Sequence, residues 1–490
     1  MDSSEYIKHD AIALADLVRR KVVTPKELME CAIRLATHYS ALYNITCYEK
    51  FDQSLAIAEQ YHCTKYFAGL PFLLKDSGIA STRFPSSSGS NLFQNTTFDK
   101  NATLVNRFER VGLIPFARTQ VPELCMAPTT ESVFNGKPTL NPWDISRSAG
   151  GSSGGAAVAV STGIVPMAHG SDGGGSIRIP ASSCGVFGFK PSRTLLPLGP
   201  NRGESLAGMA TDGVLSRTVR DSALLLDMVR GYELGGPYAS PPQRESFLAS
   251  TTPNLKRPYL KIGLLKKAWC GIPIAGPCLD AVDHTAALCE ELGHQVIEVD
   301  LPTIDYERFI DAHCTILSTA IVVGVDAKLN QLKRSLENTD LEPAIRDGYL
   351  IGKTLGADKY AQAISFIHSV GRQIEESMNG LDLMLTPSLT QLPVKLGVFE
   401  ATGGFREFRN EVASYTTFLA IINASGQPAA NVPLYWLPEN LPVGIQLIGH
   451  FGEDDVVFRL AAELERLAPW HARFPSTKDS WHSKREAHAE

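Results

Sequence analysis

Two serines set among glycines are the residues of this chain best placed to do chemistry. Ser152 lies in Gly150-Gly151-Ser152-Ser153-Gly154-Gly155, and Ser176 follows Asp172-Gly173-Gly174-Gly175. Glycine loses more freedom on folding than any other residue, so such runs suit places where backbone N–H groups approach another atom closely. A nucleophilic serine beside an oxyanion-binding turn is one such place. A tight turn with a buried, hydrogen-bonded serine fits the local sequence about equally well.

A serine hydroxyl becomes a good nucleophile only when a base takes its proton, and Lys75 is the candidate base. It ends the apolar run Leu70 to Leu74, so the chain carries its ammonium group toward the interior. Burial disfavours the charged form and would lower the lysine pKa from its usual ~10.4. The alternative is a lysine at the end of a strand that pairs with Asp76 in solvent.

Ser152 would connect the lysine to the nucleophile, because a hydroxyl both donates and accepts hydrogen bonds. The simpler interpretation makes Ser152 a helix N-cap, and the two roles are compatible. Histidine is the usual base, and His169 is the histidine nearest to this region. It follows an apolar segment with no evident partner, which is more typical of a structural residue.

Composition excludes several classes of function. The chain has 490 residues, of which 44% are hydrophobic, so it can bury a large core. A net charge of −6 predicts no nucleic-acid partner, and there is no basic run to hold the chain on a membrane. The apolar stretch 316–325 is too short to span a bilayer, and the polar N-terminus does not resemble a signal peptide. We therefore expect a cytoplasmic protein.

The nine cysteines are scattered and form no C-x-x-C pair. This pattern predicts no zinc site and suits a reducing compartment. We expect neither a metal nor an organic cofactor.

Helical and strand patterns alternate along the chain, which predicts an α/β fold with helices on both faces of a sheet. Thr24-Pro25-Lys26-Glu27 is typical of a helix start, and residues 216–230 read as a helix capped by Thr218 and Asp221. Further elements are a strand–helix–strand unit and other buried segments: strand 260–265, helix 279–292, strand 295–299, strands 381–386 and 444–449, and helix 454–467.

At these residues the sequence resembles the amidase signature family, over about Ala11 to Trp470. The matching strings stand in order along the chain: 69–76, 141–143, 150–155, 170–180, 188–191, 217–221, 425–428 and 442–446. The resemblance implies the amidase signature fold, with a large central mixed β-sheet covered by helices on both faces. It also implies one domain over 1–475, with a core motif region at 69–221, an elaborated lobe at about 240–380 and a polar tail at 476–490.

The resemblance implies a catalytic triad of Lys75, Ser152 and Ser176, with Ser152 in a cis peptide. The oxyanion hole would be formed by Gly173, Gly174 and Gly175, and the loop would be supported by Asp172, Arg178 and Ser153. By position in the family, Thr130, Phe134, Leu317 and Ile422 would line a mostly apolar pocket.

The implied activity is hydrolysis of carbon–nitrogen bonds in small-molecule amides, and also of esters and carbamates, by a monomer or homodimer. One alternative is the glutamine-hydrolysing A subunit of a tRNA-dependent amidotransferase. Against it, the segment 205–213 lacks the Ser-Leu-Asp-Gln-Ile-Gly-Pro string of such subunits. Another is a non-enzymatic phosphate- or anion-binding module that uses the glycine-rich loops. Against it, the sequence has no G-x-x-x-x-G-K-[S/T] string, and no G-x-G-x-x-G string follows a strand.

Overall fold

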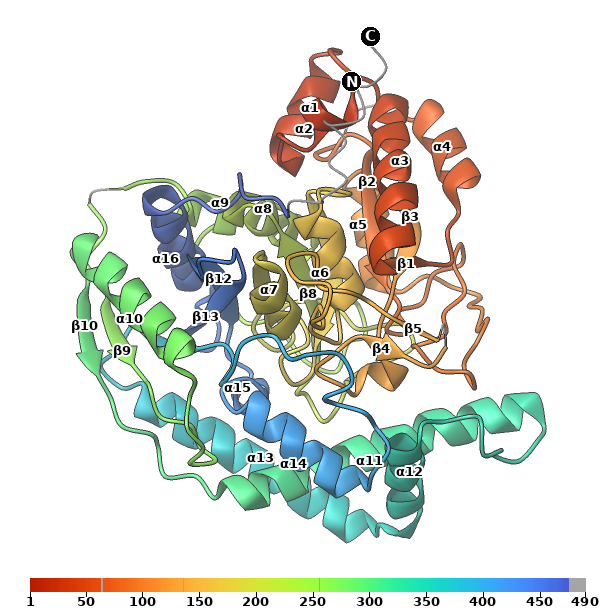
Figure 1. Cartoon of the computed structure of the whole chain (residues 1–490), viewed down its shortest axis with the longest axis vertical. Coiled ribbons are helices and arrows are strands. Elements are labelled where there is room, and N and C mark those ends of the chain that lie inside the picture. The colour runs from red at the N-terminus through yellow and green to blue at the C-terminus, as the bar shows by residue number, and fades with distance from the viewer. Residues whose placement is uncertain (63–64, 135, 255, 476–490) are drawn as a thin grey trace.

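The computed structural model describes residues 1–62, 65–134, 136–254 and 256–475. Its centre is an eight-stranded mixed sheet in the order β10-β9-β11-β13-β12-β7-β8-β6 (Figure 1). Strands β10, β9 and β11 run parallel, and every later neighbour pair is antiparallel. A second sheet, β1-β3-β2, contacts the first through β2 and β6. The expected α/β fold with a large mixed sheet is confirmed.

The strands have the following bounds: β1 Thr46–Cys47, β2 Leu70–Lys75, β3 Leu113–Thr119, β4 Glu131–Ser132, β5 Lys137–Pro138, β6 Met167–Asp172, β7 Phe187–Lys190, β8 Thr211–Ser216, β9 Lys261–Leu264, β10 Gln295–Glu298, β11 Leu383–Pro387, β12 Ala429–Trp436 and β13 Pro442–Gly449.

The helices have the following bounds: α1 Ser3–Tyr6, α2 Ala11–Arg19, α3 Pro25–Tyr43, α4 Phe51–Glu59, α5 Thr103–Arg110, α6 Gly154–Ser161, α7 Arg178–Cys184, α8 Val219–Val229, α9 Phe247–Ser250, α10 Gly276–Glu291, α11 Tyr306–Leu332, α12 Pro343–Thr354, α13 Ala357–Ser377, α14 Phe405–Tyr415, α15 Ala420–Ser425 and α16 Asp454–Leu467, with a 3-10 turn at Glu123–Cys125.

Successive side chains of a strand point to opposite faces of the sheet, so a strand with apolar side chains on both faces needs helices to cover both. In β7, Phe187 and Phe189 pack against Phe458 of α16. Gly188 between them faces the other way, where an added Cβ would lie 2.6 Å from Cβ of Ala181 in α7. The strand is therefore buried on both sides, and all four of its residues are buried.

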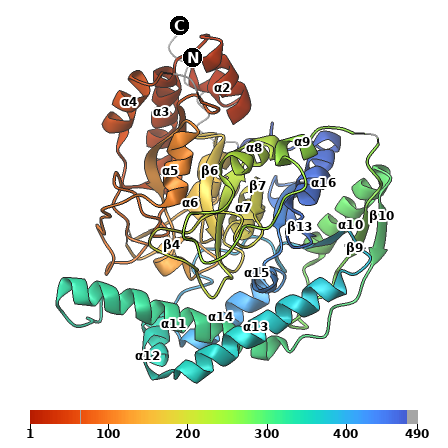
Figure 2. The ribbon, with the colours of Figure 1, turned by 180° about the vertical axis from the view of Figure 1, so that it is seen from behind.

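Helices α11, α12, α13 and α14 form a layer along one end of the molecule, seen at the bottom of Figure 1 and again from behind in Figure 2. Helix α11 is long and apolar enough, by length and composition, to cross a membrane, but half of its apolar window is buried in the fold. It contacts α12, α13 and α14, so its apolar side serves as packing surface. This is typical of a core helix in a soluble protein.

Most expected elements are present within a few residues of their predicted bounds. Thr218 is the N-cap residue of α8, as predicted, but its side chain makes no cap bond and does not pair with Asp221. Asp221 instead accepts from the backbone N–H groups of Ala11 and Ile12 and so ties α8 to α2. The one-domain division stays a prediction, although β9 and β11 join the same sheet as the core strands, and the polar tail 476–490 lies outside the described residues.

Candidate active site

The ends of β2 and β6 bring the candidate base to the serine loops. Lys75 is the last residue of β2 and is fully buried, while Ser171 and Asp172 end the neighbouring β6. The Lys75 Nζ lies 2.8 Å from Ser152 Oγ, and 3.0 Å from both the carbonyl oxygen and the hydroxyl of Ser171. The predicted Lys75–Ser152 pair is therefore within hydrogen-bonding distance.

Burial sets the protonation preference of this lysine. Removal from water lowers the pKa of the Lys75 ammonium, and the negative charge of Asp172 only partly opposes this effect. A neutral amine has two N–H donors and one lone pair. The two oxygens of Ser171 can take both donors, which leaves the lone pair for the hydroxyl of Ser152.

The solvent-exposed pairing of Lys75 with Asp76 does not occur. Asp76 is 1% exposed and accepts from the hydroxyls of Ser86 and Ser87. The side chains of residues 75 and 76 thus have different partners, and the lysine remains available to the serines.

The Ser152 loop is held against the Ser176 loop through the backbone. The N–H of Ser153 donates to the carbonyl of Ser176 at 3.1 Å, and both Ser152 and Ser176 line one cavity. The Gly151–Ser152 peptide is cis, as the resemblance implies. Gly151 has no room for a side chain, because a Cβ there would lie 2.2 Å from the carbonyl oxygen of Thr129. The helix N-cap is Ser153 rather than Ser152, and its side chain makes no cap bond.

Asp172 organises the glycine loop in front of Ser176. Its carboxylate accepts from the N–H of Gly175 at 2.7 Å and from the N–H of Ile177 at 3.1 Å. The Gly175 amide is therefore committed to holding the loop. Gly173 and Gly174 line the cavity.

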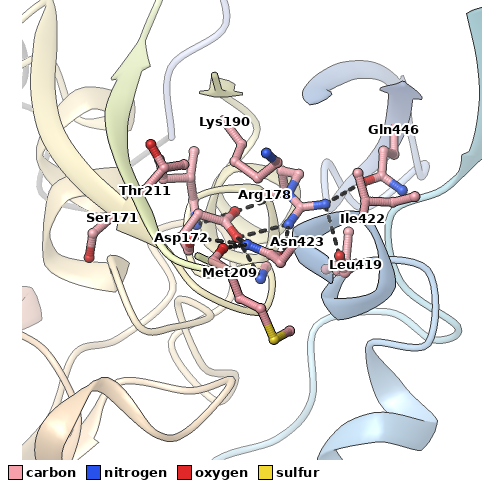
Figure 3. A network of polar contacts seen from close by, with 12 residues as sticks. Ser171, Asp172, Arg178, Lys190, Met209, Thr211, Leu419, Ile422, Asn423 and Gln446 are labelled. Carbon is pink, nitrogen blue, oxygen red and sulfur yellow. Dashed lines mark hydrogen bonds and ion pairs between the residues drawn. The ribbon is translucent and has the colours of Figure 1, made fainter. Parts of the chain in front are cut away.

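Arg178 anchors Asp172 in a buried network (Figure 3). Its guanidinium donates to both carboxylate oxygens, at 2.9 and 2.8 Å, and also to Asn423 and Gln446. Asn423 donates in turn to the backbone and side-chain oxygens of Asp172. These bonds keep the pKa of Asp172 well below its usual range despite complete burial. The sequence indicated Asp172 and Arg178 but not the role of Asn423.

His169 is a structural neighbour of Lys75 and does have partners, contrary to the sequence-based expectation. The backbone N–H of Lys75 donates to His169 Nδ1 at 3.2 Å, so the ring proton resides on Nε2, which lies 3.0 Å from Asp212. The ring is buried and holds the end of β2 against β6 and β8. Its partner Asp212 is remote in sequence, which is why no local pattern revealed it.

A cavity of about 550 Å³ opens in front of the serines. Its walls come from the 124–128 segment, the 202–210 segment, α11 and α14. Of the four predicted pocket residues, Leu317 lines it. His313 lines the cavity too, as expected from the predicted pocket segment 313–321, whereas sequence reasoning missed Arg409, which also lines it.

The other three predicted pocket residues lie elsewhere. Thr130 is buried behind the serine loop and donates to the Gly150 carbonyl at 2.8 Å. Phe134 stacks on Tyr48, and Ile422 is fully buried in the core cluster that includes α13. Position in a family locates the segment, but the direction of each side chain depends on local turns.

Within the described residues, no group of three or more His, Cys, Asp or Glu side chains is arranged to hold a metal ion. The arrangement of Lys75, Ser152 and Ser176 can do chemistry with its own hydroxyls and amine. It places a buried amine within hydrogen-bonding distance of one serine hydroxyl, and that serine lines the same cavity as Ser176.

A family model described as "Amidase" matches residues 27–458, which is most of the chain. The chain belongs to the amidase family. Hydrolysis of carbon–nitrogen bonds is the activity of this family, and the distribution of serines, glycines and lysine described above lies inside the matched region.

Individual relatives agree with this assignment. The amidase is 30% identical over 478 residues to 6-aminohexanoate-cyclic-dimer hydrolase of Paenarthrobacter ureafaciens, covering 95% of this chain and 96% of that protein. A solved structure of 6-aminohexanoate cyclic dimer hydrolase complexed with substrate superposes with a TM-score of 0.90, at 29% identity, covering 96% of this chain and 99% of that one. A bacterial aryl acylamidase gives 0.84 at 26% identity, covering 94% and 96%.

The amidotransferase alternative is less similar. The A subunit of glutamyl-tRNA(Gln) amidotransferase from Thermotoga maritima superposes with a TM-score of 0.73 at 26% identity, covering 97% of each chain. The shared fold therefore extends to that protein, but the amidase is closer in shape to the hydrolases named above.

Proposed function

We propose that this amidase hydrolyses small-molecule amides by acyl transfer through Ser176, Ser152 and Lys75, as a cytoplasmic enzyme. The observation that supports the proposal most directly is the 2.8 Å distance between the buried Lys75 Nζ and Ser152 Oγ. A buried neutral amine can accept a proton at neutral pH, and a serine relay can deliver that proton from the nucleophile.

In the first half-reaction, Ser176 Oγ bonds to the amide carbonyl carbon. Its proton moves to Ser152, and the Ser152 proton moves to Lys75. The carbonyl oxygen becomes an oxyanion, which the N–H groups of Gly173 and Gly174 would stabilise. The same relay then returns a proton to the amide nitrogen, the carbon–nitrogen bond breaks, and the amine leaves.

In the second half-reaction, water attacks the acyl-enzyme while the relay again accepts a proton. The carboxylic acid is released and the Ser176 hydroxyl is restored. The relay must work as an acid as well as a base, because an amide nitrogen leaves only after protonation.

The substrate class follows from the cavity and the relatives. A volume of about 550 Å³ suits a ligand of modest size, and Leu317 and Ile316 supply apolar walls. We propose linear or cyclic amides with aryl or alkyl groups as substrates, with carbamates and esters as further candidates.

The test compares wild-type protein with Ser176→Ala on anilide, primary amide, ester and carbamate substrates, without ATP or a partner protein. The wild type should turn over at least one amide, and the variant should lose turnover while its thermal unfolding temperature is retained. Equal activity of the two proteins would refute the assignment. Hydrolysis only in the presence of a tRNA-dependent partner would favour the amidotransferase alternative.

A further inference from the structure

One wall of the cavity carries a buried arginine that the proposed chemistry does not use. Arg409 lies on α14, is 9% exposed and lines the cavity that also contains Ser152 and Ser176. Its guanidinium donates one hydrogen bond, to the carbonyl of Met126 at 2.8 Å. In the described part of the chain, no Asp or Glu forms an ion pair with it.

The other buried arginine near the site shows what normally compensates such a charge. Arg178 is fully buried, and both oxygens of Asp172 accept from it. Buried charges are usually paired in this way, because removing an isolated ion from water is strongly unfavourable. Arg409 is also buried, but its acceptor among the described residues is the neutral carbonyl of Met126.

The groups beside Arg409 do not supply a negative charge. Its ionisable neighbours are Tyr306 and Cys314, and burial raises the pKa of both, so they are neutral at physiological pH. Burial together with the charge of Arg409 lowers the pKa of His313 to about 3, so this imidazole is neutral too.

His313 links Arg409 to the glycine loop before Ser176. The charge of Arg409 acts on His313, and an added Cβ at Gly174 would lie 3.6 Å from His313 Cε1. Of the described residues that line the cavity, Glu204 is the acidic one, and it is exposed and accepts from Tyr238. The interior wall is therefore cationic, beside a loop that would bind the scissile carbonyl.

We propose that Arg409 binds a carboxylate carried by the substrate, so that this enzyme prefers amides bearing a free acid group. A planar guanidinium with unused donors matches a carboxylate by two parallel hydrogen bonds. The proposal rests on the proposed amide hydrolysis and narrows its substrate class. The acid can stand on the acyl chain or on the leaving amine.

The competing role is structural, since the bond to Met126 ties α14 to the 124–128 wall. A structural role would weaken the hydrolysis of acidic and neutral substrates equally. Substrate discrimination therefore separates the two roles, whereas loss of activity alone would not.

The experiment measures kcat and KM for two matched pairs of substrates. One pair is glutaric acid mono-4-nitroanilide and valeric acid 4-nitroanilide, and the other is 4-(hexanoylamino)benzoate and hexanoylaniline. Arg409→Met should lower kcat/KM for at least one acid by about tenfold or more, mainly through KM, with little change for its neutral partner. Arg409→Lys should retain part of the preference.

Arg406→Met is the matched control. Arg406 lies on the same helix, but it pairs with Glu307 and Asp311 at the surface. It should leave the ratio between acidic and neutral substrates unchanged. Equal losses for both members of each pair in Arg409→Met, or no loss in either pair, would overturn the proposal.

A binding measurement covers the case in which Arg409→Met does not fold or no substrate is turned over. Glutarate should bind wild-type protein in calorimetry about tenfold more tightly than glutaramide, and Arg409→Lys should reduce this difference. Equal binding of the two compounds would overturn the proposal. Failure of amide hydrolysis with intact glutarate selectivity would instead refute the catalytic assignment.

Discussion

Lys75 Nζ and Ser152 Oγ lie 2.8 Å apart with both residues fully shielded from water. The relationship depends on two segments far apart in the sequence, the last residue of strand β2 and the turn before α6. Because a charge at this position lacks solvation, the neutral amine is the favoured form, and the pair becomes a proton acceptor.

Replacing Lys75 by arginine tests the base directly. A guanidinium stays protonated and cannot accept a proton, so Lys75→Arg should lower kcat/KM by about 10²–10⁴-fold, as Lys75→Met should. Wild-type kcat/KM should rise with pH as the lysine deprotonates, with a midpoint below the usual ~10.4 of lysine. The measurement is a pH–rate profile.

Lys190 provides the control for this profile. It is also buried, and burial together with the charge of Arg178 lowers its pKa to about 7, so its pKa, like that of Lys75, lies below the usual range of lysine. Lys190→Met should keep the rising limb of the profile. If the limb persisted in Lys75→Arg and vanished in Lys190→Met, the assignment of the base would be wrong.

The Asp172–Arg178 pair should contribute strongly to the free energy of unfolding. Asp172→Asn leaves the Arg178 guanidinium buried without a carboxylate, and breaking a buried pair in this way costs about 3–5 kcal/mol. Chemical denaturation would measure the loss. Asp300→Asn, which breaks an exposed pair with Lys267, should cause no measurable change. If Asp172→Asn lowered the free energy of unfolding as little as the control does, the view that the network holds the glycine loop would be contradicted.

The sequence was most informative where the chemistry depends on local strings. The segments around Lys75, Ser152 and Ser176 each have a distinctive local composition, so they could be located without knowledge of tertiary structure. Strand 70–74 and helix 454–467 could be predicted equally well, because apolar runs and helical periodicity are local properties of the sequence.

The residues that line the pocket were much harder to predict from the sequence. Phe134 and Ile422 were expected in it, yet one stacks on Tyr48 and the other is in the core. Arg409 lines it from a helix more than 200 positions after Ser176. Which face of that helix meets the cavity depends on the packing of α11 and α14, and no local pattern specifies this packing.

Gly155, in the first turn of α6, offers a test in which steric crowding opposes the higher helix propensity of alanine. Alanine is normally about 1 kcal/mol better than glycine in a helix. At Gly155, however, an added Cβ would lie 2.6 Å from Gln120 N and from Ile45 O. Gly155→Ala should therefore destabilise the protein by about 1–3 kcal/mol, as measured by thermal unfolding.

Gly276→Ala is the control. Nothing lies within 4 Å of an added Cβ at this position at the start of α10, so this variant should be neutral or stabilising in the same assay. Equal effects at the two sites would contradict the close approach.

His450 should make stability depend on pH. Its Nδ1 lies 2.6 Å from a Glu375 carboxylate oxygen, and this bond raises the pKa of His450 to about 9. Because the folded-state pKa is raised above the unfolded value of ~6.5, the stabilisation is fully present below about pH 6.5 and is lost as pH rises through about 9. The unfolding temperature of wild type should therefore exceed that of His450→Gln by more at pH 6 than at pH 9.5.

His9→Gln is the control, because His9 makes an exposed contact with Glu5. Its unfolding temperature should differ little from that of wild type at either pH. A gap between wild type and His450→Gln that stayed constant across this range would show that the ring contributes through packing rather than through its charge.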